Sequence, residues 1–246
     1  MLRTSRRQVL RLGVGAGVAA SLPGWWSDDL LVHAGAAPPA GAREGTVAPA
    51  TFFRPAELAW IKAALDRLIP RDVLGPGAVD AGVATFIDSQ LGGRYGQAID
   101  WYMAGPWEKG TDQQGYQLQR TPAELYRAAI AAIDAHCRQR FDQKVFAALA
   151  PEQQDGLLHE LQNGKLELAD VSGKTFFDLL WKNTKEGFFA DPMYGGNRGF
   201  IGWKLVGFPG PRYNYVADIR HFGQPYPLPT VGILGRDPSR RAQVPA

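Results

Sequence analysis

The side chains that most often catalyse reactions or bind metals are few and widely spaced in this 246-residue sequence. Three of its four histidines follow residue 36, at His136, His159 and His221, and they share no metal-ligand spacing. None pairs recognisably with a serine or cysteine nucleophile, so a hydrolytic triad has no support. We expect His136 to be a hydrogen-bonded core residue and His159 to be exposed.

Short motifs for redox cofactors and phosphates are also absent. The sequence has no G-x-G-x-x-G, no Walker A loop, no C-x-x-C-H haem attachment and no H-E-x-x-H. One cysteine excludes an internal disulfide and any four-cysteine metal site. We therefore predict no catalytic, cofactor-binding or metal-binding residue in this chain.

The N-terminus has the pattern of an export signal. Arg6 and Arg7 precede an apolar, glycine-rich run from Leu12 to Leu22, which is typical of the twin-arginine route. As a helix this run would reach about 17 Å, less than the bilayer core of about 30 Å. We predict a twin-arginine signal peptide at 1–36, which places the chain in the periplasm. Because that route carries folded passengers, the signal also suggests that a bound partner is exported.

The net charge argues against nucleic acid as a ligand. Residues 1–36 hold four of the 27 basic and two of the 24 acidic residues, which leaves 23 basic and 22 acidic residues in the body. Phosphate neutralisation needs a clear excess of cations, so a body with a net charge of +1 is a poor candidate for nucleic-acid binding.

Residues 51–186, after a Pro/Gly/Ala-rich linker at 37–50, have the periodicity of a helical domain. One apolar stripe runs from Leu58 to Ile69 and stops at Pro70; a second helix is expected over 79–91 and a short one near 95–103. Thr121 to Glu124 form a capping pattern for a third long helix. Further helices are expected from Pro151 to Asn163-Gly164, and around 176–184 with an end at Gly187. The predicted fold class is mainly α.

Cys137 lies on the third long helix, at helical spacing from Ile133 and Phe141. This spacing favours a buried, inert thiol. The alternative is an intersubunit disulfide, because an unpaired cysteine in an exported protein can bridge to another chain.

The composition changes at Gly187. The last 60 residues contain ten glycines and eight prolines, which argues against regular elements. Ten aromatic residues nevertheless fall between 188 and 226, so this segment must pack on something, either its own helical body or a partner. We assign 187–246 as an irregular, aromatic-rich, partner-binding segment. The predicted contact residues are Phe188, Phe189, Asp191, Tyr194, Asn197, Arg198, Trp203 and Phe208.

The loop around Asp191 and Arg198 has two interpretations. Gly195, Gly196 and Asn197 tolerate left-handed backbone, which predicts a tight, irregular loop. Arg198 then either bonds Asp191 within the chain or presents its guanidinium to a partner.

The string from Gly187 to Arg198, continued by Gly202 to Gly210, resembles the gluconate 2-dehydrogenase subunit 3 family. The likeness extends upstream to the segments 68–70, 75–78, 82–83 and 86–88 and to the twin-arginine signal, so it covers most of residues 1–215. Gly199 stands where that family often has an acidic residue, so no carboxylate role is expected at that point.

The resemblance implies a non-catalytic small subunit that binds, stabilises and co-exports another chain. That partner would be an FAD-dependent catalytic subunit of the glucose–methanol–choline oxidoreductase type, acting on gluconate, glucose or fructose. A cytochrome c subunit with haem c would join them, and the complex would associate indirectly with the cytoplasmic membrane. The alternatives are a free-standing exported enzyme with a site among Asp191, Arg198 and His221, or a carbohydrate-binding module. If the chain is such a subunit, we expect segments 92–120 and 187–226 to supply aromatic and backbone contacts to the catalytic chain.

Overall fold

The computed structural model describes residues 50–108, 110–166, 168, 171–221 and 223–235. The predicted signal peptide with Arg6 and Arg7, almost all of the linker, Phe222 and the last eleven residues lie outside the described residues. The described part contains six α-helices and no strand, which confirms the mainly α fold.

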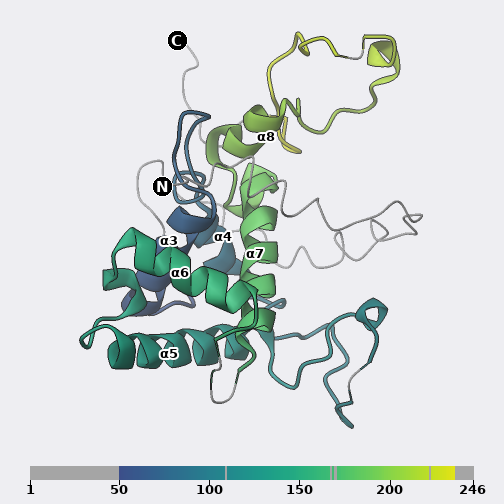
Figure 1. Ribbon diagram of the computed structural model, residues 1–246. Coiled ribbons are helices and arrows are strands. Elements are labelled where there is room, and N and C mark those ends of the chain that lie inside the picture. Colours follow the sequence, from purple (N-terminus) through teal and green to yellow (C-terminus); the bar gives the residue numbers. More distant parts are fainter. Residues whose placement is uncertain (1–49, 109, 167, 169–170, 222, 236–246) are drawn as a thin grey trace.

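Five helices form the body, and a sixth follows at its edge. They are α3 (Pro55–Leu68), α4 (Val83–Gly92), α5 (Pro122–Arg140), α6 (Pro151–Gln162), α7 (Gly173–Phe189) and α8 (Ile201–Val206). Figure 1 shows α7 upright beside the other body helices, and it contacts every other α-helix of the described part. None of these helices is both long and apolar enough to cross a bilayer.

Local sequence signals explain where most helices begin and end. At α5, the Thr121 backbone N–H donates to Glu124 Oε2 (2.8 Å) and the Glu124 N–H donates to Thr121 Oγ1 (3.3 Å), which is the predicted capping box. Helix α3 ends before Pro70, and α6 ends before Asn163 and the left-handed Gly164, both as predicted.

Three predicted boundaries are wrong. Helix α4 begins at Val83, not 79, because Gly82 adopts a left-handed φ of 77°. Residues 94–100 form successive turns in place of the helix expected near 95–103, since Gly96 folds back onto α4 and a Cβ there would lie 1.9 Å from the Leu91 carbonyl oxygen. Helix α7 continues past Gly187 to Phe189, because this glycine makes room for α4 and does not end the helix.

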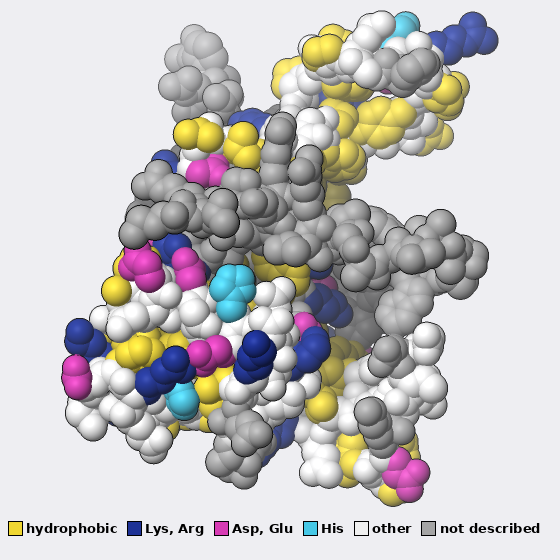
Figure 2. Space-filling view, in the orientation of Figure 1, with side chains coloured by type: hydrophobic (Ala, Val, Ile, Leu, Met, Phe, Trp, Pro, Cys, Tyr) yellow, Lys and Arg dark blue, Asp and Glu magenta, His cyan; other side chains and the backbone are white. Residues whose placement is uncertain are grey.

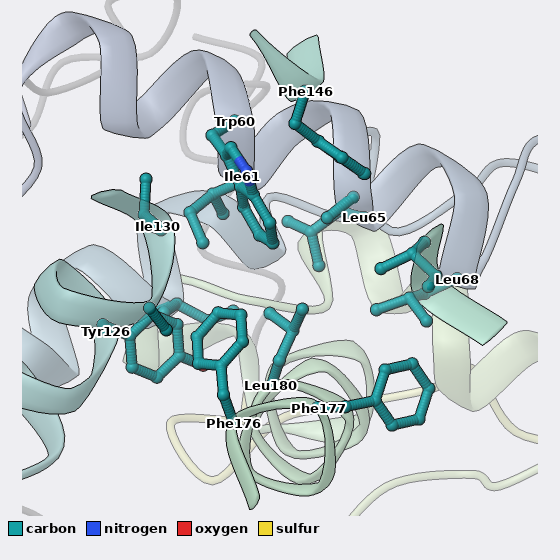
Figure 3. Packing of buried hydrophobic residues seen from close by; sticks show 14 of the residues in the cluster. Trp60, Ile61, Leu65, Leu68, Tyr126, Ile130, Phe146, Phe176, Phe177 and Leu180 are labelled. Carbon is teal, nitrogen blue, oxygen red and sulfur yellow. The ribbon is translucent and has the colours of Figure 1, made fainter. Parts of the chain in front are cut away.

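Aromatic side chains from α3, α5, α7 and the short 3-10 helix Phe146–Ala148 meet in the core (Figure 3). The Trp60 ring lies 4.6 Å from that of Phe146 and 5.7 Å from that of Phe176, between centroids, and Tyr126 packs edge-on against Phe176 at 5.3 Å. All four residues are fully buried. Aromatic pairs at these separations add to the free energy gained from burial alone.

A buried amide on α7 connects the polar groups inside this body. Asn183 accepts a hydrogen bond from the Tyr126 hydroxyl (2.9 Å), and its Nδ2 donates to the Tyr95 hydroxyl (3.0 Å) and to Glu186 (2.9 Å). Burial raises the pKa of both tyrosines above the usual value, so both donate as neutral phenols. The network joins α5, α7 and the turns after α4.

Asp88 on α4 fastens the segment that leads into α3. Its buried carboxylate accepts hydrogen bonds from the backbone N–H groups of Thr51 (2.6 Å), Phe52 (3.1 Å) and Phe53 (2.8 Å). Bonds from several N–H groups to one carboxylate are stronger than neutral ones. The buried Phe53 is held over the core by this contact.

Asp88→Ala should lower the free energy of unfolding by about 2–4 kcal/mol, because it leaves up to three backbone donors without an acceptor. Chemical denaturation of the mature chain measures this. Asp66→Ala, which removes an exposed carboxylate from α3, is the control and should change stability by about 0.5 kcal/mol or less. Equal effects of the two substitutions would contradict the anchoring role.

Candidate partner-binding surface

Three glycines allow the chain that follows α7 to pack closely on the end of that helix. A Cβ at Gly196 would lie 2.1 Å from the Gly187 carbonyl oxygen, and one at Gly202 would lie 2.1 Å from the Phe188 carbonyl oxygen. Gly187 faces α4, where a Cβ would come within 2.7 Å of the Phe86 ring. The glycine-rich string is therefore a packing motif in which backbone meets backbone.

The same loop contains a run of left-handed backbone. Gly195, Asn197, Gly199 and Phe200 have φ values of 94°, 47°, 62° and 59°. A bulky residue such as Phe200 adopts this conformation only where its surroundings hold it. Its ring stacks on Trp203 with centroids 5.3 Å apart and planes 12° apart, and both side chains are buried.

Asn197 fixes the loop from inside. Its Nδ2 donates to the Ala190 carbonyl oxygen (2.8 Å), and its Oδ1 accepts from the Gly202 N–H (2.8 Å). The side chain is fully buried, so this chain itself covers it. Trp203 adds a parallel bond from its indole N–H to the Phe189 carbonyl oxygen (2.7 Å). These bonds join the start of α8 to the end of α7.

Asp191 and Arg198 do not bond each other in the structure. Asp191 is buried and accepts hydrogen bonds from the N–H of Met193 (3.0 Å) and of Ile233 (2.6 Å). Arg198 instead lies over the N-terminus of α4, with its Nη2 donating to Thr85 Oγ1 (3.0 Å). The first of the two interpretations, a bond between Asp191 and Arg198, is thus wrong, because the left-handed turn directs Arg198 back toward α4.

The predicted contact residues divide by their exposure. Phe188, Asp191, Asn197 and Trp203 are buried, whereas Phe189, Tyr194 and Arg198 are partly exposed and Phe208 is exposed. Phe208 packs edge-on against Trp203 with centroids 5.0 Å apart. Contact of these residues with a partner stays a prediction, and only the second group offers surface to one.

Two long segments project from the body on the side of α7 (Figure 1). We call the described residues of 101–120 the middle arm and the described residues of 211–230 the C-terminal arm. In the middle arm, Trp101 packs between Tyr95 (5.6 Å) and Tyr116 (4.8 Å), while Tyr102 is exposed.

The C-terminal arm exposes large apolar side chains that are not among the eight predicted contact residues. Figure 2 shows hydrophobic side chains gathered along it, away from the body. The most exposed are Tyr213, Val216, Ile219 and Leu228. Three of these are aliphatic and are absent from the predicted contact residues, which are aromatic, charged or amide side chains. Aliphatic residues in a proline-rich segment that lacks helical periodicity were the sequence signal that could have indicated this exposed surface.

The alternative of a free-standing enzyme gains no support from the geometry. Asp191 and Arg198 are engaged as described, His221 is exposed on the C-terminal arm, and no bond joins the three within the described part. His159 is exposed, as predicted. The described residues also contain no group of three or more potential metal ligands.

His136 differs from its prediction. The residue is partly buried, and its Nε2 is covered without a hydrogen-bond partner among the described residues. Position 136 borders the apolar stripe of α5 beside the fully buried Cys137, so its Nε2 is covered without gaining a hydrogen-bond partner in the described part. The expected hydrogen bond in the core is therefore absent from the described contacts.

Cys137 is fully buried in the core cluster and is not in a disulfide. Burial raises the pKa of its thiol to about 11, and the charge of Asp134 acts in the same direction. Both features favour the inert thiol over the intersubunit disulfide, because a bridge would require α5 to leave the core.

The comparison with known proteins identifies the family. A family model described as Gluconate 2-dehydrogenase subunit 3 matches residues 55–210, which is more than half of the chain. The chain belongs to this family, as its resemblance predicted. Neither a curated protein nor a solved structure matches it.

Asn197→Ala should lower the free energy of unfolding by about 2–4 kcal/mol, since it removes two buried hydrogen bonds and strains the left-handed backbone. Asn197→Gly should recover about 1 kcal/mol, because glycine tolerates the same φ. Denaturant titration measures both, with the exposed Asn214→Ala as control. An effect of Asn197→Ala no larger than that of Asn214→Ala would contradict this role.

Cys137 should resist alkylation in the folded chain. At pH 8 a thiol with a pKa of about 11 is about one part in a thousand thiolate, and the core also blocks the reagent. Iodoacetamide labelling, followed by mass spectrometry, should be at least about a hundredfold slower than in the chain unfolded in guanidinium. Equally fast labelling, or a heavier band that disappears on reduction, would disprove the buried thiol.

Proposed function

We propose that this member of the gluconate 2-dehydrogenase subunit 3 family is a non-catalytic small subunit. In this proposal it binds and stabilises an FAD-dependent catalytic subunit of the glucose–methanol–choline type and carries it through the twin-arginine route. The substrate of the complex would be gluconate, glucose or fructose, or a related sugar or sugar acid. The match over residues 55–210 is the observation that carries the proposal, because the family indicates a subunit of a gluconate 2-dehydrogenase complex.

The body of the chain supports a scaffold role. Its aromatic core and the Asn183 network join five helices through residues of this chain. A scaffold that is folded before it meets its partner suits export in the folded state. It also loses little conformational entropy when it binds, so more of the contact energy contributes to affinity.

The glycine-rich string does not have the form of a nucleotide-binding loop. Such loops leave glycine N–H groups open to a phosphate at a helix N-terminus. Here Gly196 and Gly202 lie against carbonyl oxygens of α7, and the Gly202 N–H donates to Asn197. The string thus favours a structural role in this chain, with the flavin in the proposed partner.

The two arms supply the surface that the proposal needs. The middle arm exposes Tyr102, and the C-terminal arm exposes an aromatic and several aliphatic side chains. Large apolar side chains left in water on projecting segments are typical of surfaces that a partner covers. For a permanent complex we expect a total buried area of about 2,000 Å² or more.

The same proposal includes the rest of the complex. A cytochrome c subunit would receive electrons from the flavin through its haem c and would link the assembly to the cytoplasmic membrane. This chain would therefore work in the periplasm and touch the membrane only indirectly.

Co-expression with a gene for an FAD-dependent dehydrogenase from the same organism tests the proposal. The tagged chain should co-purify with a yellow flavoprotein from the periplasm. Replacing the arginine pair (Arg6→Lys with Arg7→Lys) should leave both chains in the cytoplasm, because only this chain carries the export signal. Cell fractionation with immunoblots measures the distribution.

Arg11→Lys is the matched control, since it makes the same change outside the pair and should leave export intact. Export of the catalytic subunit despite the double substitution would refute co-export. A colourless monomer that oxidises a sugar by itself would support the free-standing enzyme, and sugar binding by that monomer would support a carbohydrate-binding module.

A further inference from the structure

The C-terminal arm is a closed loop whose two ends meet at the body. The Val231 N–H donates to the Pro209 carbonyl oxygen (3.3 Å), which brings the two ends of the arm side by side. Gly210 has a φ of 88°, and a Cβ at this position would lie 1.8 Å from the Val231 carbonyl oxygen. The base of the arm therefore closes only because position 210 is glycine.

A second contact fixes the returning end to α7. The Ile233 N–H donates to Asp191 Oδ2 (2.6 Å), and Asp191 lies two residues beyond the end of α7. Gly232 faces the same carboxylate, where a Cβ would lie 3.0 Å from Oδ2. The buried Asp191 thus positions the arm relative to the body.

Contacts within the arm join its two sides near the base. The Tyr215 hydroxyl donates to the Gly210 carbonyl oxygen, and its ring meets Tyr226 edge-on with centroids 5.9 Å apart. The Arg212 guanidinium lies 5.3 Å from the centre of the Tyr226 ring and donates to the Pro229 carbonyl oxygen. These groups tie the two sides of the loop together near its base and leave its far part free.

The far part of the arm exposes aliphatic side chains, whereas the helical body buries most side chains of this type. Val216 is 70% exposed and Ile219 69% exposed, beside the exposed Tyr213 and Leu228. The segment 211–230 also carries two arginines against one aspartate, and Arg220 is exposed. A surface that complements it is apolar and has an acidic rim.

We propose that the C-terminal arm is a preformed docking loop that fits an apolar, acid-rimmed groove of the catalytic subunit and determines which catalytic subunit this chain accepts. The family match ends at residue 210, and the arm begins at residue 211. The helical body is therefore the framework that the family shares, and the arm is a feature of this chain outside the matched region. This inference rests on the proposed function.

Two other occupants fit the arm less well. A second copy would bring two cationic arms together, so like charges would meet. An anionic membrane would satisfy the charge, but the family is one of subunits in a protein complex. The catalytic subunit is the occupant that fits both the net positive charge of the arm and the membership of the family in a protein complex.

Ile219→Asp tests the docking surface in the co-expressed, mature complex. This change places a charge within the exposed apolar surface of the arm, so the dissociation constant should rise by about tenfold or more. Val73→Asp is the matched control: Val73 is an exposed valine on the turn between α3 and α4, and its substitution should change affinity by about twofold or less. Mass photometry on dilution of the complex measures both.

Gly210→Ala tests the closed base without altering the surface of the arm. Gly207→Ala is its control, because Gly207 also has a positive φ (74°) but has open space where a Cβ would lie. An alanine at either position has to adopt a positive φ. Only the alanine at position 210 would also clash with the Val231 carbonyl oxygen and force it away. We expect Gly210→Ala to weaken the complex by about tenfold, with a melting temperature of the free chain close to that of Gly207→Ala.

The outcomes separate this inference from the proposed function. If the wild-type chain forms the complex and neither Ile219→Asp nor Gly210→Ala weakens it, the arm proposal is wrong and the proposed function stands. If the wild-type chain binds no flavoprotein, the proposed function is wrong. Ile219-dependent self-association in sedimentation velocity, or Ile219-dependent binding to phosphatidylglycerol vesicles, with the complex unaffected, would also overturn the docking loop.

Discussion

The chain that follows α7 packs closely on the C-terminal end of this helix, and this contact positions α8 and the C-terminal arm. Gly187 admits the Phe86 ring from α4, and Gly196 and Gly202 place two later turns directly on α7 carbonyls. No larger residue fits these three positions. The Asn197 amide then bonds both sides of the contact. Because this junction is rigid, it fixes where α8 begins and where the C-terminal arm leaves the body.

The chain combines a closed interior with an open periphery. Inside, the aromatic rings pack in tilted and edge-on pairs, and Asn183, Asp88 and Asp191 each satisfy two or more donors or acceptors. Outside, the C-terminal arm leaves aliphatic side chains in water that a free-standing domain of this size would have covered. This contrast is what a subunit of a larger complex requires: stability of its own, and a surface completed by another chain.

Signals between neighbouring residues were sufficient to predict the helical body. The Thr121–Glu124 capping pattern, Pro70 and the Asn163-Gly164 pair act within one turn of the chain, so their meaning does not depend on the fold. Gly187 shows the limit of such signals. A glycine that ends a helix and a glycine that admits a neighbouring helix have the same local sequence, and only the position of Phe86 distinguishes them.

The candidate site depends on contacts that sequence spacing does not contain. Asp191 bonds Ile233, which lies 42 residues later, and Arg198 bonds Thr85, which lies 113 residues earlier. The proximity of Asp191 and Arg198 in sequence suggested a pair that the left-handed turn between them prevents. Sequence spacing also does not predict which aromatic residues are exposed. Trp203 and Phe208 pack against each other, yet Trp203 is buried and Phe208 is exposed.

Hydrogen–deuterium exchange of this chain, free and bound to the flavin-containing catalytic subunit, measures which segments the partner covers. Binding should slow exchange strongly over residues 211–230 and 101–120, while the amides of α5 and α6 should exchange at the same rate in both states. Protection confined to α5 and α6, with both arms unchanged, would contradict this prediction.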